Sequence, residues 1–180
     1  NCWRLAGHGD QTFTEAVCNS CNPVFVQVGL GLGQETFYNY FKAFGLTERT
    51  GIDLPGEQVG QIRASDTMNK VDLAVYAFGQ NFTITPIQMI TACAAVANGG
   101  YLVEPQVVSK IIDDDGNIIE SFDTTVKRQV ISKETSERIS KILNLNATTG
   151  TAKNGYVAGY QICGKTGTSE KVAKFYEEGG

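Results

Sequence analysis

The sequence lacks a long hydrophobic run, an excess of positive charge and an initiator methionine. No stretch approaches the roughly 20 apolar residues of a transmembrane helix, so we expect none of these residues to span a membrane. Lys and Arg number 15 against 19 Asp and Glu, giving a net charge of −4 and no electrostatic basis for binding nucleic acid or anionic lipid. The chain begins at Asn1 and ends in two glycines, and we expect it to be a piece of a longer protein.

Helix caps and the spacing of apolar residues predict several helices in a domain-sized chain of 180 residues. Thr12 and Glu15 have the spacing of a capping box, and Thr85 followed by Pro86 is a typical helix start. The helix that follows Pro86 is nearly all apolar and is expected to be buried on every side. The expected helices are residues 12–19, 23–33 (Val24, Val28 and Leu32 on the buried face), 34–44 (Phe37, Tyr40, Phe41 and Phe44 inward), 65–70, 86–97 and 132–145.

Fewer segments have the pattern of β-strands. Residues 107–112 and 118–122 flank an acidic turn that contains glycine, which predicts a hairpin. Another strand is expected at 156–164. The same stretch, from Gly159 to Thr166, also matches G-x-x-x-x-G-K-T, the pattern of a phosphate-binding loop. Its inner residues favour a strand over a turn and no helical pattern follows, so nucleotide binding is the lesser alternative.

Metal-binding residue types are concentrated in the first 21 positions. Cys2, His8, Asp10, Cys18 and Cys21 all lie there, and the last two form a C-x-x-C pair. Thiolate, imidazole and carboxylate groups so close together predict a structural Zn²⁺ with four of these five as ligands. The alternatives are a set of small buried thiols, or a disulfide if the compartment is oxidising.

Four ordered motifs resemble those of a known family. Ser20-Cys21-Asn22 has the form S-x-N between two predicted helices, and Lys165 begins K-T-G-T 143 residues after Asn22. Between them, residues 50–57 and 79–89 resemble connecting motifs of the same family. The chain is thus similar to class B penicillin-binding proteins, of the sporulation or septal type.

The resemblance implies a fold and an activity. The fold would be α/β (α+β), an antiparallel sheet with helices on both faces, like other penicillin-binding transpeptidases and β-lactamases. Residues 1–180 would be part of that domain, from S-x-N to just beyond K-T-G. The function would be that of a serine D,D-transpeptidase, which cross-links peptidoglycan stem peptides and is acylated by β-lactams. The family's nucleophile lies in an S-x-x-K element, which does not occur here, so we expect the chain alone to be inactive.

The resemblance also assigns roles. Ser20 and Lys165 would help to pass a proton to the leaving D-alanine, and the amide of Asn22 would hold the substrate's peptide group. The substrate's terminal carboxylate would be bound by Lys165, Thr166 and Thr168, and the Thr168 N–H would be an oxyanion donor. A glycine at Gly167 lets the substrate backbone approach closely.

Other expectations concern partners and location. Catalysis would need no cofactor. Partners would be stem peptides, β-lactam antibiotics and other cell-wall synthesis proteins, with no nucleic acid and membrane contact only through an N-terminal anchor outside these residues. The location would be the extracytoplasmic face of the bacterial cell membrane. A β-lactam sensor or a non-catalytic scaffold of the same fold is the alternative function.

Overall fold

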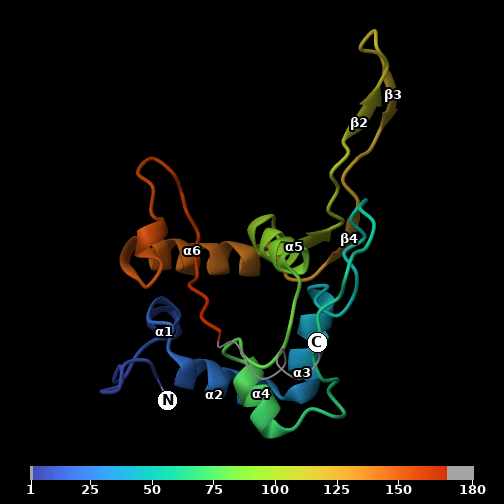
Figure 1. Ribbon diagram of the computed structural model, residues 1–180. Coiled ribbons are helices and arrows are strands. Elements are labelled where there is room, and N and C mark those ends of the chain that lie inside the picture. Colours follow the sequence, from blue (N-terminus) through green and yellow to red (C-terminus); the bar gives the residue numbers. More distant parts are fainter. Residues whose placement is uncertain (1, 170–180) are drawn as a thin grey trace, which may run out of the picture.

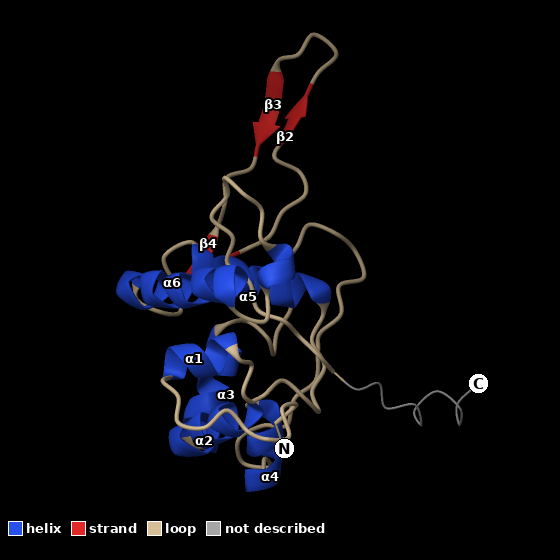
Figure 2. Cartoon of the chain, turned by 90° about the vertical axis from the view of Figure 1, so that its left-hand side faces the viewer, coloured by secondary structure: helices blue, strands red, loops and turns tan. Residues whose placement is uncertain are grey.

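The computed structural model describes residues 2–169 and combines helices with short antiparallel strands (Figure 1). Helices α5 and α6 lie next to each other, and α1 to α4 form a second group beneath them (Figures 1 and 2). In chain order the elements are α1 (Phe13–Cys18), α2 (Asn22–Leu32), α3 (Gln34–Ala43), α4 (Lys70–Tyr76), α5 (Pro86–Ala97), β1 (Tyr101–Val103), β2 (Lys110–Ile112), β3 (Ile118–Ser121), β4 (Val126–Gln129), α6 (Lys133–Thr149) and the 3₁₀ turn η1 (Lys153–Gly155).

The first three helices lie where the sequence predicts them. Thr12 and Glu15 form the expected capping box of α1, and Pro23 occupies the first turn of α2. The expected buried face of α2 is wrong, because Val28 and Leu32 are 40% and 46% exposed. The helix instead packs on α4 through Gly29, where an added Cβ would lie 2.5 Å from the Cβ of Ala77. The contact between α2 and α4 therefore depends on a glycine and not on a row of large aliphatic side chains.

The helix expected at 65–70 is wrong, because α4 begins at Lys70. Asn69 caps it, accepting hydrogen bonds from the N–H groups of Val71 and Asp72, and the Asp72 carboxylate accepts from the Asn69 N–H in return. Residues at and after the start of α4 place their apolar side chains in one core, which also contacts α3. That core consists of Met68, Leu73 and Tyr76, with Phe37, Tyr38, Ile62 and Phe82 packed against it.

The inward face predicted for α3 is correct only in part. Phe41 is buried and its ring meets that of Phe82 edge to face, with centroids 5.1 Å apart. Tyr40, by contrast, is half exposed. A residue one position from Phe41 is turned about 100° around the helix, so the apolar character of Tyr40 does not place it on the same face.

Helix α5 is buried on one side only, contrary to expectation. Met89 and Ile90 are 48% and 64% exposed, whereas Gln88 is 1% exposed. The Gln88 amide accepts a hydrogen bond from the Gly60 N–H (3.1 Å) and donates one to the Glu48 carbonyl (2.8 Å). The buried face thus binds the loop that precedes α4 through polar groups with satisfied hydrogen bonds.

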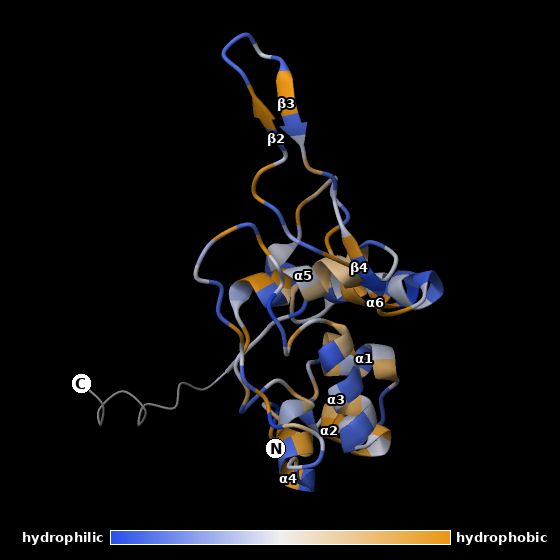
Figure 3. Cartoon of the chain, turned by 90° about the vertical axis from the view of Figure 1, so that its right-hand side faces the viewer, coloured by the Kyte–Doolittle hydropathy of each residue, from blue (hydrophilic) through white to orange (hydrophobic). Residues whose placement is uncertain are grey.

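The strands form two separate antiparallel ribbons within residues 2–169, β1 with β4 and β2 with β3. The β2–β3 hairpin is the one predicted, and it extends away from the helices with apolar residues exposed (Figure 3). The mixed α/β class with antiparallel pairing is therefore confirmed. The strand predicted at 156–164 is wrong, because the described residues of that stretch pair with no other strand.

Helix α6 follows Ser132, which is its N-cap and not its first residue as predicted, and the helix runs one turn further than expected, to Thr149. Its last two turns carry Asn144 and Asn146, whose side chains bind the segment before Lys165. In the part of the chain that the structure describes, no helix has the length and hydrophobicity to cross a membrane.

Candidate active site

The S-x-N residues form the tight connection between α1 and α2. Ser20 has a φ of 50°, a left-handed conformation that is uncommon for a residue with a side chain. Backbone hydrogen bonds on either side support it: the Ser20 N–H donates to Val17 O (3.1 Å) and the Cys21 N–H to Ala16 O (3.0 Å). Asn22 follows as the half-buried first residue of α2. The turn therefore holds the side chains of Ser20 and Asn22 at the N-terminal end of one helix.

Lys165 reaches this turn from the other end of the chain. Its ammonium Nζ donates a 2.8 Å hydrogen bond to Ser20 Oγ, across 145 residues of sequence, and a second of 3.1 Å to the Thr166 carbonyl. Partial burial lowers the pKa of Lys165 below the ordinary value of a lysine, because desolvation disfavours the charged amine. Two of the predicted catalytic residues thus form one hydrogen-bonded pair.

The segment before Lys165 is held by α6 rather than by a neighbouring strand. Asn144 Nδ2 donates to the Ile162 carbonyl (2.9 Å), and Asn146 Nδ2 donates to the Gly164 carbonyl (2.7 Å). The Gly164 N–H donates to the carbonyl of Leu143 (3.2 Å). Asparagine side chains thus supply two of the donors that a neighbouring strand would supply in a sheet.

A short corner after α6 links the two halves of the site. The Thr151 N–H donates to the Cys18 carbonyl at the end of α1 (3.0 Å), and its hydroxyl lies 3.2 Å from that of Thr166. An added Cβ at Gly150 would come within 2.9 Å of the same Cys18 carbonyl. The corner therefore fits closely between the S-x-N turn and the K-T-G segment.

The side chain of Gln80 holds the two residues that follow K-T-G. Its Nε2 donates to the Thr168 carbonyl (2.6 Å), and its Oε1 accepts from the Ser169 hydroxyl (3.3 Å). The next residue, Asn81, has a φ of 65°, so the backbone turns sharply beside these contacts. Sequence analysis placed Gln80 in a family motif but assigned it no role. Its place in that motif, a few residues before the Thr85 cap, was the signal that the sequence offered.

The other predicted substrate-binding residues are exposed. Thr166, Gly167 and Thr168 are all open to solvent, and a Cβ at Gly167 would meet nothing within 4 Å. This leaves room for a ligand along the K-T-G segment. The phosphate-loop alternative lacks its helix, since residues 165–169 are not helical and the amine of Lys165 points to Ser20.

Three of the five predicted metal ligands come together beside the S-x-N turn. Ligand atoms of Cys2, His8 and Cys21 all lie within 4.8 Å of one another, and Cys2 Sγ is 3.3 Å from His8 Nδ1. Cys18 and Asp10 are not part of this group. The structure thus brings together three of the five candidate ligands, although the expected site would need four.

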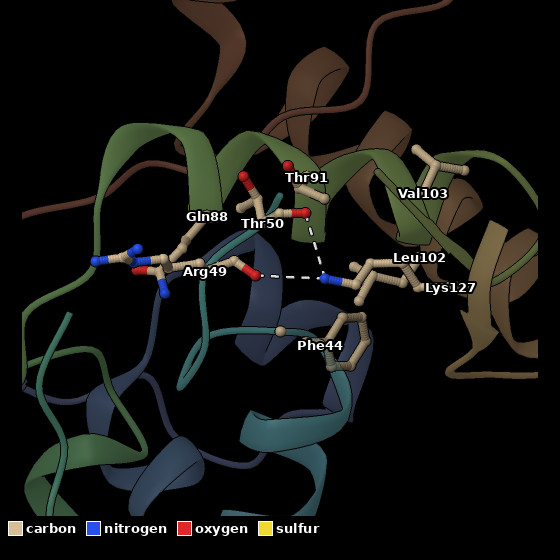
Figure 4. Close-up of a pocket in the computed structure, with 9 residues that line it drawn as sticks. Phe44, Arg49, Thr50, Gln88, Thr91, Leu102, Val103 and Lys127 are labelled. Atoms are coloured by element: carbon tan, nitrogen blue, oxygen red, sulfur yellow. Dashed lines mark hydrogen bonds between the residues drawn. The ribbon is translucent and has the colours of Figure 1, made fainter. Parts of the chain in front are cut away.

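A small hollow elsewhere in the molecule has the side chain of Lys127 in its lining. It is lined by Phe44, Gln88, Leu102 and neighbouring residues (Figure 4). Lys127 Nζ donates there to the carbonyls of Arg49 and Thr50, at 3.3 Å each. These are structural contacts between β4 and the loop after α3, and neither Ser20 nor Lys165 lines the hollow.

Comparison with known proteins assigns the family. Stage V sporulation protein D of Bacillus subtilis (strain 168) is 43% identical over 172 residues, which are 95% of this chain and 27% of that protein. PbpB of Mycobacterium tuberculosis (strain ATCC 25618 / H37Rv) is 30% identical over 168 residues, 89% of this chain and 25% of that protein. The chain therefore spans about a quarter of the length of these relatives.

Solved structures agree. The D,D-transpeptidase domain of a peptidoglycan glycosyltransferase from Eggerthella lenta superposes with a TM-score of 0.84 at 25% identity, covering 95% of this chain and 45% of that one. Penicillin-binding protein 3 from Mycobacterium tuberculosis, complexed with aztreonam, gives 0.82 at 29% identity, covering 91% and 38%. Residues 1–178 match the family model described as the penicillin-binding protein transpeptidase domain. With sequence, structure and the two motifs that meet at Ser20 and Lys165 in agreement, the chain belongs to the penicillin-binding protein transpeptidase family.

Proposed function

We propose that residues 1–180 are part of a serine D,D-transpeptidase domain, one that cross-links peptidoglycan stem peptides and is acylated by β-lactams. The observation that carries the proposal is the 2.8 Å hydrogen bond from Lys165 Nζ to Ser20 Oγ, which joins the S-x-N and K-T-G elements. Several relatives are named peptidoglycan D,D-transpeptidases, among them MrdA of Haemophilus influenzae.

The proposed reaction is acyl transfer in two steps. A serine of an S-x-x-K element outside these residues adds to the carbonyl of the terminal D-alanyl-D-alanine bond. The C–N bond breaks, the nucleophile's proton passes to the leaving nitrogen, and D-alanine departs. The resulting ester then reacts with an amine of a second stem peptide, which releases the serine. A β-lactam would acylate the same serine, but its ring nitrogen stays attached and no fragment leaves.

The residues of this chain would transfer the proton and bind the substrate. Ser20 Oγ already accepts from the Lys165 ammonium, so the pair forms a short path along which a proton reaches the leaving nitrogen. The exposed hydroxyls of Thr166 and Thr168, with the Lys165 charge, would bind the substrate's terminal carboxylate. Asn22, at the start of α2, would hold the peptide group, and the Thr168 N–H would face the developing oxyanion.

The same proposal includes the cellular location and the partners of the parent protein. Its location would be the extracytoplasmic face of the bacterial membrane, together with other cell-wall synthesis proteins. Support comes from the sporulation and penicillin-binding relatives.

Acylation by a fluorescent penicillin tests the function. In the full-length protein, Lys165→Ala should slow labelling by a factor on the order of 10²–10³, the usual effect of losing a transition-state contact. Lys141→Ala is the matched control, because Lys141 is an exposed lysine of α6 that takes no part in the hydrogen bond between Ser20 and Lys165. The isolated 180-residue chain should not be labelled, since it has no S-x-x-K. Equal labelling of both variants, or a labelled serine in the isolated chain, would contradict the proposal. A full-length protein that binds penicillin without cross-linking activity would point to a sensor or scaffold.

A further inference from the structure

We propose that the β2–β3 hairpin is a docking site for a basic, extended segment of another protein, which would add to the hairpin as a third strand. The hairpin lies at the opposite end of the molecule from the helices α1 and α2 that flank the S-x-N turn (Figure 1). The proposal therefore goes beyond the transpeptidase function and does not depend on it. It rests on the exposure, the open edges and the charge of residues 107–123.

The hairpin exposes apolar side chains on both of its faces. Every residue of β2 and β3 is exposed. Ile111 and Ile112 are consecutive in β2, and consecutive side chains of a strand point to opposite faces. Ile118 and Ile119 of β3 are 62% and 67% exposed, and the hairpin projects from the rest of the structure (Figure 3). A protruding apolar surface of this kind is typical of a protein–protein contact.

The two strands also have open edges. Within residues 2–169, β2 pairs only with β3, so the outer edge of each strand lacks a neighbouring strand. A two-stranded hairpin is at best marginally stable in water, whereas a third strand adds main-chain hydrogen bonds and covers apolar side chains. An extended segment that binds along one of these edges would gain both contributions.

Side chains at the tip and at the base give the hairpin a defined shape. At the tip, the Asp113 carboxylate accepts hydrogen bonds from the backbone N–H of Asn117 (2.7 Å) and from its side-chain amide (2.9 Å). At the base, the Asp53 carboxylate accepts from the N–H groups of Val107 (2.7 Å) and Val108 (2.9 Å). A preformed ribbon loses less conformational entropy on binding than a flexible loop would.

The charge of the hairpin determines the kind of partner. Residues 107–123 contain five acidic residues and one lysine, a net charge of −4, which equals that of the whole chain. The remaining residues are balanced, so the excess negative charge is concentrated on the hairpin. A second copy of the hairpin or an anionic membrane would be repelled, whereas a segment with Lys or Arg would be attracted. The partner segment should therefore carry basic residues for the acidic turn and aliphatic residues for the isoleucines.

Binding of two synthetic peptides to the full-length protein tests the site. The first alternates Lys and Val over about eight residues, roughly the length of a strand. The second has the same side chains but a methyl group on every backbone nitrogen, which removes the donors that strand pairing needs. We expect the first peptide to bind, with an affinity that falls as the salt concentration rises, and the second not to bind.

Substitutions in the hairpin should weaken binding of the first peptide. Asp114→Asn combined with Asp115→Asn should weaken it about two- to thirtyfold at low salt, the range expected for the loss of two surface ion pairs. Ile119→Thr keeps a β-branched residue in the strand and should weaken binding by about fivefold or more, as loss of a buried interface side chain does.

Matched controls lie outside the hairpin. Glu134→Gln combined with Glu137→Gln removes the same charge from exposed positions of α6, and Ile90→Thr replaces an isoleucine of α5 that is 64% exposed. Both controls should bind the first peptide as the wild-type protein does. Every variant should keep the wild-type rate of acylation by fluorescent penicillin, so failure of this proposal is distinguishable from failure of the proposed function.

Several results would overturn the proposal. One is a full-length protein that does not bind the first peptide, as expected if residues of the parent protein outside this chain cover the hairpin. Equal binding of the methylated peptide would show attraction by charge without strand pairing. Equal weakening in the α6 control would place the peptide elsewhere. Binding to phosphatidylglycerol vesicles, or dimerisation, that is lost in Ile119→Thr would assign the hairpin to a membrane or to a second copy of the chain.

Discussion

The side chain of Gln80 binds the backbone at Thr168, 88 residues further along the chain, through a 2.6 Å hydrogen bond from Nε2 to the carbonyl. Its Oε1 accepts from the Ser169 hydroxyl at 3.3 Å. One amide therefore holds two consecutive residues directly after K-T-G. The proposed oxyanion donor is the Thr168 N–H, which lies in the peptide group just before the one that Gln80 binds, so its direction depends on how residue 168 is held.

Replacing Gln80 should therefore impair acylation more than stability. In the full-length protein, Gln80→Ala should slow fluorescent-penicillin labelling by about tenfold, the equivalent of one net hydrogen bond of ~1.4 kcal/mol. The melting temperature should change little, since this contact lies at the surface. Gln27→Ala, an exposed glutamine of α2, is the control and should label at the wild-type rate. If Gln80→Ala labels as fast as the Gln27→Ala control, the link has no role in the site.

Asn146 should matter mainly for stability. It is fully buried and donates to the Gly164 carbonyl, so Asn146→Ala leaves that carbonyl without its partner at a cost of about 1–3 kcal/mol. We expect a lower melting temperature and faster alkylation of Cys163, which lies in the released segment. Asn154→Ala removes an exposed asparagine and should change neither measurement. Unchanged alkylation of Cys163 in the Asn146→Ala variant would mean that other contacts hold the segment.

The ion pair between Glu48 and Arg128 predicts a pH dependence of stability. A 2.6 Å hydrogen bond from Arg128 lowers the pKa of Glu48 below its ordinary 4.5. A carboxyl with a lowered pKa stabilises the folded state above its unfolded pKa, and the contribution is lost as the pH falls through the folded pKa. Glu48→Gln should therefore cost up to ~1 kcal/mol at pH 7, given the partial exposure of the pair, and nothing near pH 2.

Thermal unfolding of the wild-type protein and of the Glu48→Gln variant, followed from pH 7 to pH 2, measures the effect. Glu120→Gln, an exposed change on β3, should show no such trend. A Glu48→Gln penalty that persists unchanged at pH 2 would show that the side chain acts through packing instead of charge.

Local signals in the sequence predicted some of the fold well. The caps at Thr12 and Thr85 act between neighbouring residues, so the starts of α1 and α5 follow from a few letters. The buried side of a helix depends on what packs against it. Gly29 against Ala77, and the exposed Ile90, are results of tertiary packing that hydrophobicity alone does not encode.

The sequence predicted the site residues that belong to a motif, but not the contacts that support these residues from distant parts of the chain. Ser20, Asn22 and Lys165 were named from S-x-N and K-T-G, and the structure brings Ser20 and Lys165 together. The support from Asn146 lies in no recognisable motif, and the motif that contains Gln80 did not indicate what its side chain binds. A polar side chain that binds a backbone carbonyl carries no residue-specific signal, because any residue offers that carbonyl.

The variant Lys165→Arg distinguishes two roles of Lys165, binding a carboxylate by its charge and transferring a proton. Arginine keeps the positive charge and donates hydrogen bonds, but it does not release its proton in proteins. If Lys165 passes a proton through Ser20, the arginine variant should acylate almost as slowly as Lys165→Ala. If the lysine only binds a carboxylate by charge, arginine should retain most of the rate. We expect the first result, because Nζ lies within 2.8 Å of a hydroxyl that accepts from it.

The pH profile of acylation gives a second measurement of the same role. Burial lowers the pKa of Lys165 below its ordinary 10.5, so the ammonium form is lost at a lower pH than for an exposed lysine. Wild-type acylation should accordingly decline on the alkaline side, with a midpoint below 10.5. That decline should be absent from the residual activity of Lys165→Arg and unchanged in Lys141→Arg, whose lysine is exposed. An arginine variant that keeps both the rate and the alkaline decline would assign the proton transfer to another group and leave Lys165 only the binding of the carboxylate.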